Sequence, residues 1–209
     1  MDKKLTSQIF DHALHNLTQR DEDLARVIRD YGRPTVLRRT GGFKSLVLLI
    51  LEQQVSLASA DACYKRLITA VPRLNPLNIL ALSDSGFREA GVSRQKTRYI
   101  RDLADAVLNK RLKLQSLLYL RDEEVRENLS QVKGIGPWTA DVYLLACLSR
   151  PDVWPTGDIA LQTAVRDIKG LGNRPDEKEL FEIGELWKPW RSVAASLLWH
   201  YYRNVVRKK

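Results

Sequence analysis

The residue types that could carry out chemistry gather in two short stretches of the second half of the chain. The first is the turn Gly134-Ile-Gly136-Pro137, and the second ends at Asp158, which follows 22 residues after Gly136 (158 − 136). A tight turn whose free backbone N–H groups lead into a helix can bind an anion such as phosphate. Asp158 brings a carboxylate to the point where the chain enters another helix, a position in which aspartate commonly caps the helix.

Two helices have to position the turn. Leu129 and Val132 can close the incoming helix onto a core. Pro137 suits the first turn of an outgoing helix, which runs from Trp138 to Leu148. Both glycines of the turn can adopt positive φ without steric cost, so the chain can reverse tightly. Such a turn also occurs as a plain structural connection, so its geometry alone leaves both interpretations open.

Helical periodicity runs through almost the whole chain, because apolar residues recur at intervals of three or four positions. Ser, Asn and Asp residues stand where several of these segments begin, as N-caps do. We expect helices at 5–17, 21–31, 43–54, 56–71, 75–82, 83–90, 93–107, 114–118, 122–129, 138–148, 159–169, 176–187 and 190–206. No segment of useful length alternates with period two, so strands are not expected and the predicted fold class is all-α.

Composition favours a globular protein with an anionic partner. The chain has 209 residues, of which 44% are hydrophobic, and this is enough for a proper core. Lys and Arg number 34 against 25 Asp and Glu, and the formal net charge of +9 favours a polyanion such as nucleic acid. The two cysteines, Cys63 and Cys147, are too few for a disulfide framework or a four-cysteine metal site.

Neither a signal peptide nor a membrane span is expected. The start of the chain, from Met1 to Leu5, lacks the apolar segment of a signal peptide. The longest apolar run, from Leu46 to Leu51, is too short to cross a bilayer. We therefore expect an intracellular protein of the cytoplasm or nucleoid, without a membrane partner.

Four blocks of sequence stand in order along the chain. They are Ile50-Leu-Glu-Gln-Gln-Val-Ser56 within 43–59, Val132-Lys-Gly-Ile-Gly-Pro-Trp-Thr-Ala140, Thr156-Gly-Asp-Ile-Ala-Leu-Gln162, and Trp187-Lys-Pro-Trp-Arg-Ser-Val-Ala194 running on to Trp199. Together they resemble the helix-hairpin-helix (HhH-GPD) superfamily of DNA base-excision glycosylases, and most closely its 3-methyladenine DNA glycosylase II branch. The similarity covers roughly 40–205, most of the chain.

The resemblance implies an all-α, two-lobed fold with the DNA cleft between the lobes. One lobe would join 1–41 with 151–209, and the other would comprise 42–150. The second lobe would end in the helix-hairpin-helix, at about 123–148.

The same resemblance assigns the chemistry. Asp158 is the implied catalytic residue, because a fixed carboxylate can stabilise an oxocarbenium-like sugar and orient water when an N-glycosidic bond breaks. Trp138 occupies the hairpin position where strand-nicking members carry a nucleophilic lysine, and Lys133 lies on the other side of the turn. The implied enzyme is a monofunctional glycosylase that flips alkylated purines of the 3-methyladenine and 7-methylguanine type out of duplex DNA and leaves an abasic site.

A base pocket is also implied. Trp138 and Trp199 match pocket positions of the resembled branch, where an electron-rich indole face suits a cationic alkylpurine. Tyr143 stands next to a position where the family carries an aromatic residue, so it is a further candidate. Gln53 faces either the pocket or the opposite DNA strand, or it is a satisfied core amide.

The expected DNA-binding surface surrounds the turn. Its candidate residues are Lys133, Gly134, Gly136, Thr139, Ser93 and Arg94. Arg94 is the expected residue that fills the gap left by the flipped base; alternatively, Ser93 caps a helix and Arg94 contacts phosphate. A basic surface is expected on the helix that begins there, formed by Arg94, Lys96, Arg98 and Arg101.

No cofactor is expected to be required. The resemblance allows a Na⁺ or K⁺ ion at the hairpin carbonyls of Ser130, Val132 and Ile135, and the chain lacks the four cysteine ligands of the iron–sulfur relatives. The expected partner is double-stranded DNA with damaged bases, bound by a monomer. Two alternatives stay open: a glycosylase for oxidised, deaminated or mismatched bases, and a non-catalytic helix-hairpin-helix module, which needs neither Asp158 nor Trp199.

Overall fold

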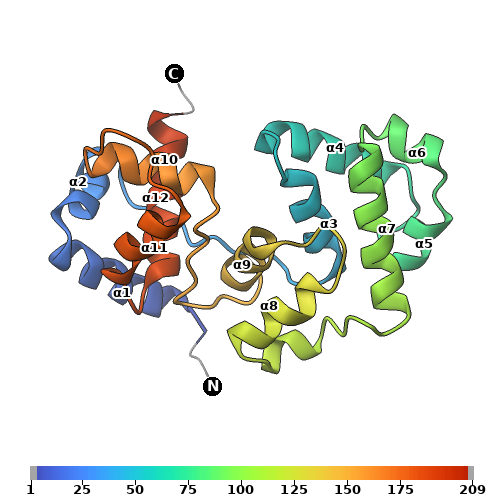
Figure 1. Cartoon of the computed structure of the whole chain (residues 1–209), viewed down its shortest axis with the longest axis horizontal. Helices are drawn as coiled ribbons and strands as arrows, with labels where there is room; N and C mark the ends of the chain where they lie inside the picture. Colours follow the sequence, from blue (N-terminus) through green and yellow to red (C-terminus); the bar gives the residue numbers. More distant parts are fainter. Residues whose placement is uncertain (1–3, 207–209) are drawn as a thin grey trace. The chain divides into compact units, whose positions relative to one another are not determined.

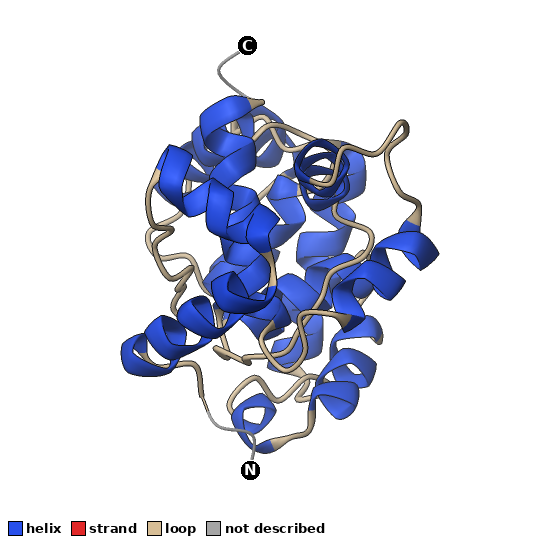
Figure 2. Ribbon diagram, turned by 90° about the vertical axis from the view of Figure 1, so that its left-hand side faces the viewer, coloured by secondary structure: helices blue, strands red, loops and turns tan. Residues whose placement is uncertain are grey.

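A computed structural model describes residues 4–206, and within this range the chain forms helices and no β-strand (Figures 1 and 2). The elements are α1 (Ser7–Arg20), α2 (Glu22–Tyr31), α3 (Phe43–Glu52), α4 (Leu57–Thr69), α5 (Pro76–Ala81), α6 (Asp84–Glu89), α7 (Arg94–Leu108), the 3-10 turn η1 (Ser116–Tyr119), α8 (Asp122–Ser130), α9 (Pro137–Ala146), α10 (Ile159–Ile168), α11 (Glu177–Glu185) and α12 (Arg191–Val205). The all-α prediction is confirmed. None of the helices in this part of the chain combines the length and the apolar composition that crossing a bilayer requires.

Several helices begin at the polar residues that the sequence singled out as caps. The Ser56 hydroxyl accepts a hydrogen bond from the Ser59 N–H at 3.1 Å, and the Asn75 side chain accepts one from the Asn78 N–H at 2.9 Å. Each of these bonds satisfies an N–H group that has no partner inside its own helix. The expected helix at 114–118 is only the short turn η1, which begins two residues later.

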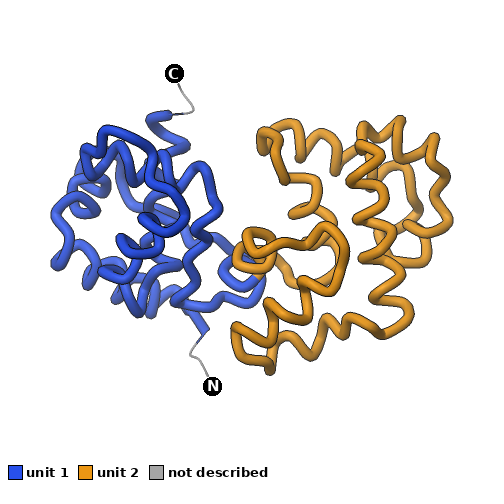
Figure 3. Tube along the Cα trace, viewed as in Figure 1, with its two compact units in different colours: residues 1–38, 144–209 blue, residues 39–143 orange. Residues whose placement is uncertain are grey.

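The chain divides into two compact units (Figure 3). Unit 1 consists of the described parts of Met1–Arg38 and Leu144–Lys209, and unit 2 of Arg39–Tyr143. Unit 2 is therefore one continuous piece of sequence, whereas unit 1 is made from two. The second crossing between the units falls inside α9.

Helix α12 forms the centre of unit 1. It packs against α1, α2 and α10, and every residue from Ser192 to Leu198 is buried. A helix buried on all sides must satisfy its polar side chains internally. The Ser192 hydroxyl accepts from the Val153 N–H at 2.9 Å, and the Ser196 hydroxyl donates to the Ser192 carbonyl at 2.9 Å. Trp199 follows directly on this fixed segment.

Unit 2 is built on α3 and α7. Apolar side chains cover most of the circumference of α3, which packs against both α4 and α7, and α7 also packs against α5 and α6. Helix α7 buries Ile100, Leu103 and Ala104 and directs other side chains toward the turn between α8 and α9. The expected basic surface of α7 is smaller than predicted. Lys96 donates to the carbonyls of residues 51 and 53, and Arg101 donates to the Leu82 carbonyl at 2.8 Å.

Candidate active site

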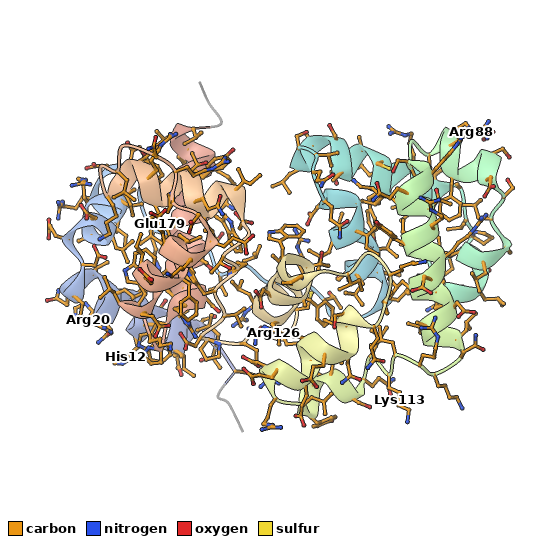
Figure 4. The ribbon with its side chains drawn as sticks, in the orientation of Figure 1. His12, Arg20, Arg88, Lys113, Arg126 and Glu179 are labelled. Atoms are coloured by element: carbon orange, nitrogen blue, oxygen red, sulfur yellow. The ribbon has the colours of Figure 1, made fainter. Side chains whose placement is uncertain are left out.

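The predicted turn lies between α8 and α9 and is closed by an ion pair. The Val132 N–H donates to the Leu129 carbonyl at 3.1 Å, which ends α8, and the Ile135 N–H donates to the Val132 carbonyl at 3.0 Å. Arg126 of α8, labelled in Figure 4, donates from its guanidinium to an Asp141 carboxylate oxygen of α9 at 2.7 Å. These contacts close the turn and link its two helices.

The structural reason for a glycine differs between the two positions of the turn. Gly134 has φ of 87°, and a methyl group added to it would overlap the ring of Tyr99 on α7. Gly136 does not have positive φ, and a methyl group there would meet only open space. The positive φ that the sequence allowed at both positions is therefore used only at Gly134. Gly136 leaves room for close approach from outside.

The N–H groups of Gly134 and Gly136 are available to a ligand. Across residues 4–206, no acceptor receives a hydrogen bond from either group. The Lys133 N–H, by contrast, donates to Asp102 Oδ2 on α7 at 2.7 Å, while the Lys133 side chain is exposed. The turn thus presents two glycine N–H groups with one lysine beside them, an arrangement that can bind an anion.

Gln53 holds the turn from the end of α3. Its Nε2 donates to the Gly134 carbonyl at 2.8 Å and to Thr139 Oγ1 at 2.9 Å. Both donors of the Gln53 amide are therefore used inside unit 2, in line with the sequence interpretation of a satisfied amide. Thr139 is only 1% exposed, so its side chain fixes the turn and is not open to DNA.

Tyr143 is a correction to the predicted base pocket. Its side chain is 1% exposed, and its hydroxyl accepts from the Gly42 N–H at 2.9 Å. A ring without an open face cannot stack on a base. Tyr143 therefore ties α9 to the start of α3, and this pairing across about a hundred residues left no local signal in the sequence.

Asp158 and Trp199 meet within unit 1. Asp158 is the N-cap of α10, and its Oδ1 accepts both the Leu161 N–H at 2.9 Å and the Trp199 indole N–H at 3.1 Å. The carboxylate is only 8% exposed. Its backbone is held as well, since the Asp158 N–H donates to the Pro155 carbonyl at 3.0 Å. The result is a carboxylate with a fixed orientation at the positive end of a helix dipole.

Ser93 and Arg94, predicted at the start of α7, lie on the surface, whereas Trp138 at the start of α9 is partly covered. Ser93 caps α7 by accepting from the Lys96 N–H at 3.3 Å, and Arg94 is exposed in the first turn. Trp138 lies in the first turn of α9 and is half-buried. Ser93 thus acts as the cap that the sequence offered as the alternative to a DNA contact.

The loop between α3 and α4 lies in one of the four sequence blocks, but among its residues only Gln53 was predicted to belong to the site. Gln54 has φ of 56° although it is not glycine, and Val55 and Leu57 are 46% and 47% exposed. A non-glycine residue in the left-handed region is held there by its surroundings, and such strain is often associated with function. The sequence signal for this loop was weak, because it consisted only of a capping residue, Ser56, shortly after an apolar helix.

A metal site would have to depend on the backbone of the hairpin. Among the residues that the structure describes, no group of three or more His, Cys, Asp or Glu side chains is arranged to hold a metal ion. The Val132 carbonyl already accepts from the Ile135 N–H, but a carbonyl oxygen has a second lone pair. A monovalent cation at the carbonyls of Ser130, Val132 and Ile135 therefore stays a prediction.

This geometry defines a class of protein. Its members are all-helical, contain a helix-hairpin-helix, and hold a carboxylate in a fixed orientation at the start of a later helix. The sequence pattern of the HhH-GPD superfamily of base excision DNA repair proteins matches residues 47–190, and the chain belongs to this superfamily. The resemblance of the four sequence blocks is thereby confirmed.

Similar proteins share this fold over most of the chain. The structure of a 3-methyladenine DNA glycosylase from Schizosaccharomyces pombe in complex with abasic DNA is 26% identical, has a TM-score of 0.83, and covers 90% of this chain and 95% of its own. A DNA-3-methyladenine glycosidase from Bacillus halodurans is 32% identical with a TM-score of 0.77, covering 94% and 91%. A DNA-3-methyladenine glycosylase from Bacillus subtilis (strain 168) is 27% identical over 75% of this chain, which spans 56% of that relative's length.

Proposed function

We propose that the protein is a monofunctional DNA glycosylase that hydrolyses the N-glycosidic bond of alkylated purines in duplex DNA and leaves an abasic site. The observation that carries the proposal is the Asp158 carboxylate, which accepts from Leu161 N–H and the Trp199 indole at a helix N-terminus. The names of the similar proteins support the same substrate class.

Asp158 stabilises positive charge in the proposed reaction. The bond between C1′ and the purine nitrogen breaks, its electron pair leaves with the base, and the sugar becomes oxocarbenium-like. A carboxylate of fixed orientation stabilises that charge and directs a water molecule to C1′. The water loses a proton as its oxygen bonds to C1′. An alkylated purine such as 3-methyladenine carries a positive charge, so it leaves as a neutral base without an acid to protonate it.

The tryptophans suit the substrate and the outcome of the reaction. Trp199 and Trp138 offer indole rings, and a cationic purine is attracted to such a ring face. Trp138 cannot act as an amine nucleophile, so the reaction ends at the abasic site without a covalent enzyme–DNA intermediate.

DNA binding is proposed for the hairpin and its surroundings. The N–H groups of Gly134 and Gly136 would receive a backbone phosphate, with the exposed Lys133 beside them. The net charge of +9 favours this partner. The finer expectations, a monomer acting inside the cell on damaged duplex DNA without a required cofactor, belong to the same proposal. Size measured in solution, and base release after dialysis against a chelator, test the monomer and the cofactor.

Asp158→Asn tests the proposal. Asn caps a helix about as well as Asp and keeps an acceptor for Leu161 and Trp199, so the fold is expected to remain. Base release from methylated duplex DNA is expected to fall by at least about 100-fold, because the negative charge is lost. Binding to a duplex with a stable abasic-site analogue is expected to change little.

Asp176→Asn is the matched control. Asp176 caps α11 in the same way as Asp158 caps α10, but it is exposed and forms a capping box with Glu179. Its variant should release bases at the wild-type rate. Near-wild-type release by Asp158→Asn would remove Asp158 from the reaction.

A panel of duplexes, each with one defined lesion, separates the alternatives. Release of alkylated purines supports the proposed substrate class. Release of oxidised, deaminated or mismatched bases alone would replace it with a different glycosylase activity. Tight binding without release from any duplex would instead identify a non-catalytic DNA-binding module.

The loop between α3 and α4 is a second candidate for filling the gap left by the flipped base. Gln54 is exposed, conformationally strained and adjacent to exposed Val55, whereas Arg94 lies on a regular helical turn. We expect Gln54→Ala to lower base release from paired DNA by roughly 10-fold, since flipping must overcome a few kcal/mol of unstacking. Release from an unpaired lesion should change less. A larger loss for Arg94→Ala than for Gln54→Ala would return the role to Arg94.

A further inference from the structure

We propose that Lys96 is a positioning residue that aims the hairpin N–H groups through Gln53, without touching DNA itself. The inference rests on the proposed function, since DNA binding is its main readout. It concerns contacts within unit 2 alone, where α3, α7 and the hairpin are joined by hydrogen bonds.

The first step joins α7 to the end of α3. Lys96 Nζ donates to the Leu51 carbonyl at 2.7 Å and to the Gln53 carbonyl at 2.8 Å. The last carbonyls of a helix have no partner inside the helix and carry partial negative charge, so an ammonium group there is stabilising. Lys96 thereby fixes the backbone of Gln53 just before the strained residue Gln54.

The second step joins Gln53 to the turn. The residue whose carbonyl accepts from Lys96 donates through its own side chain to the Gly134 carbonyl and to Thr139 Oγ1. Gln53 therefore accepts a hydrogen bond at its backbone carbonyl and donates hydrogen bonds from its side-chain amide. A shift of the Gln53 backbone would be passed to both ends of the turn.

The third step is the alignment of α7 with the turn. Lys96, Tyr99 and Asp102 follow one another at intervals of three residues, so they lie on neighbouring positions of one helix face. Tyr99 packs against Gly134, and Asp102 accepts the Lys133 N–H. Lys96 is thus the end of a row on α7 that holds the hairpin from one side.

The main rival role for Lys96 is a direct phosphate contact. Its ammonium is directed at two protein carbonyls and is half-buried, whereas Arg94 and Arg98 on the same helix are exposed. Burial also lowers the pKa of Lys96, which is unlike a solvated surface lysine. The geometry therefore separates Lys96 from the exposed cations beside it.

Lys96→Met is the test, with Lys65→Met as control. Methionine keeps an apolar stem and removes the donors, and Lys65 is an exposed lysine of α4 paired with Asp61. Affinity for a duplex with a stable abasic-site analogue is measured over a series of salt concentrations. Lys96→Met is expected to bind roughly 5- to 20-fold more weakly than wild type at every salt concentration, as for loss of a charged hydrogen bond. Its salt slope should equal that of wild type.

Two results of this titration would overturn the proposal. A salt slope reduced by about one unit would identify Lys96 as a phosphate contact. Wild-type affinity combined with a lowered melting temperature would make Lys96 merely structural. Should Lys96→Met fail to fold, Gln53→Met carries the same test, because it breaks the connection at its next step.

A double-mutant cycle with Gln53→Met tests the connection itself. If both residues act through one series of contacts, the double variant loses little more affinity than Gln53→Met alone. If the fold-losses in affinity of the two single variants multiply in the double variant, the two residues act independently, and this result would overturn the inference.

An experiment without DNA keeps the inference separate from the proposed function. In ¹⁵N-labelled free protein, the amide resonances of Gly134 and Gly136 should shift in Lys96→Met and stay unchanged in Lys65→Met. Unmoved resonances overturn the inference whatever the protein binds. A wild-type protein that neither binds the duplex nor releases a base would contradict only the proposed function.

Discussion

At the scale of single residues, function and local structure coincide at Asp158. As an N-cap it accepts the Leu161 N–H, and in the proposed reaction the same fixed carboxylate faces developing positive charge. Its position was predictable because an aspartate before a helical segment is a local signal. Its bond with the Trp199 indole was not, since 41 residues separate the two in the sequence (199 − 158).

The two glycines of the hairpin make a paired prediction. Gly134→Ala is expected to lower the free energy of unfolding by about 1–3 kcal/mol or more, because it combines positive φ with overlap on Tyr99. Gly136→Ala is expected to stay within about 0.5 kcal/mol of wild type, since its methyl group meets open space. Urea unfolding of both variants measures this difference.

The same pair separates folding from binding. Gly136→Ala should still bind abasic-site DNA more weakly than wild type, because its methyl group occupies the space through which a phosphate would approach the backbone. Unchanged affinity for Gly136→Ala would argue against phosphate binding at this turn.

At the scale of elements, Asp21 ties three parts of unit 1 together. It caps α2, accepts from Lys169 Nζ at 2.8 Å just after α10, and accepts from the Trp187 indole at 2.8 Å just after α11. Burial alone would raise the pKa of Asp21, but the hydrogen bonds from Lys169, Trp187 and the Leu24 N–H, together with the charge of Lys169, lower the pKa overall.

Stability should therefore depend on the ionisation of Asp21. Because its pKa is lower in the folded protein than in the unfolded chain, its contribution is present above the unfolded value of about 4 and is lost as the pH falls through the folded value. Asp21→Asn should lower the free energy of unfolding at pH 7 and flatten its decline in acid. Denaturant unfolding between pH 7 and pH 2 measures both, and an unchanged acid slope would contradict the assignment.

Elements were more predictable than the contacts between them. α-Helices appear at every expected position except 114–118, where only the turn η1 forms, because capping residues and apolar periodicity are local properties of the sequence. Lys96 was expected on a basic surface, but a lysine has a long stem that can reach back to the carbonyls of another helix. The overlap of Gly134 with Tyr99 likewise depends on packing that no local pattern records.

At the scale of the whole molecule, the net charge predicts that the affinity for DNA depends on salt concentration. The chain carries a formal net charge of +9, and Lys133, Arg94 and Arg98 are exposed around the hairpin and on α7. Each phosphate neutralised by such a residue releases counterions, so binding weakens as salt rises.

Salt titration checks this expectation. If these three cations each neutralise one phosphate, affinity for undamaged duplex should fall roughly 40-fold between 50 and 200 mM salt. Affinity that is independent of salt would contradict a binding surface based on phosphate contacts.

The division of unit 1 into two stretches of sequence sets an order of events during synthesis. Helix α1 packs against α12, helix α2 packs against both α10 and α12, and α10 begins 128 positions after the end of α2 (159 − 31). At a translation rate of about 5–20 residues per second, their partners emerge roughly 6 to 25 seconds later, after all of unit 2 has been made. During that interval the apolar faces of α1 and α2, with Phe10, Leu17 and Leu24, have no core to enter. Nascent chains that stall within unit 2 should therefore depend on chaperones to shield this amino-terminal helix pair.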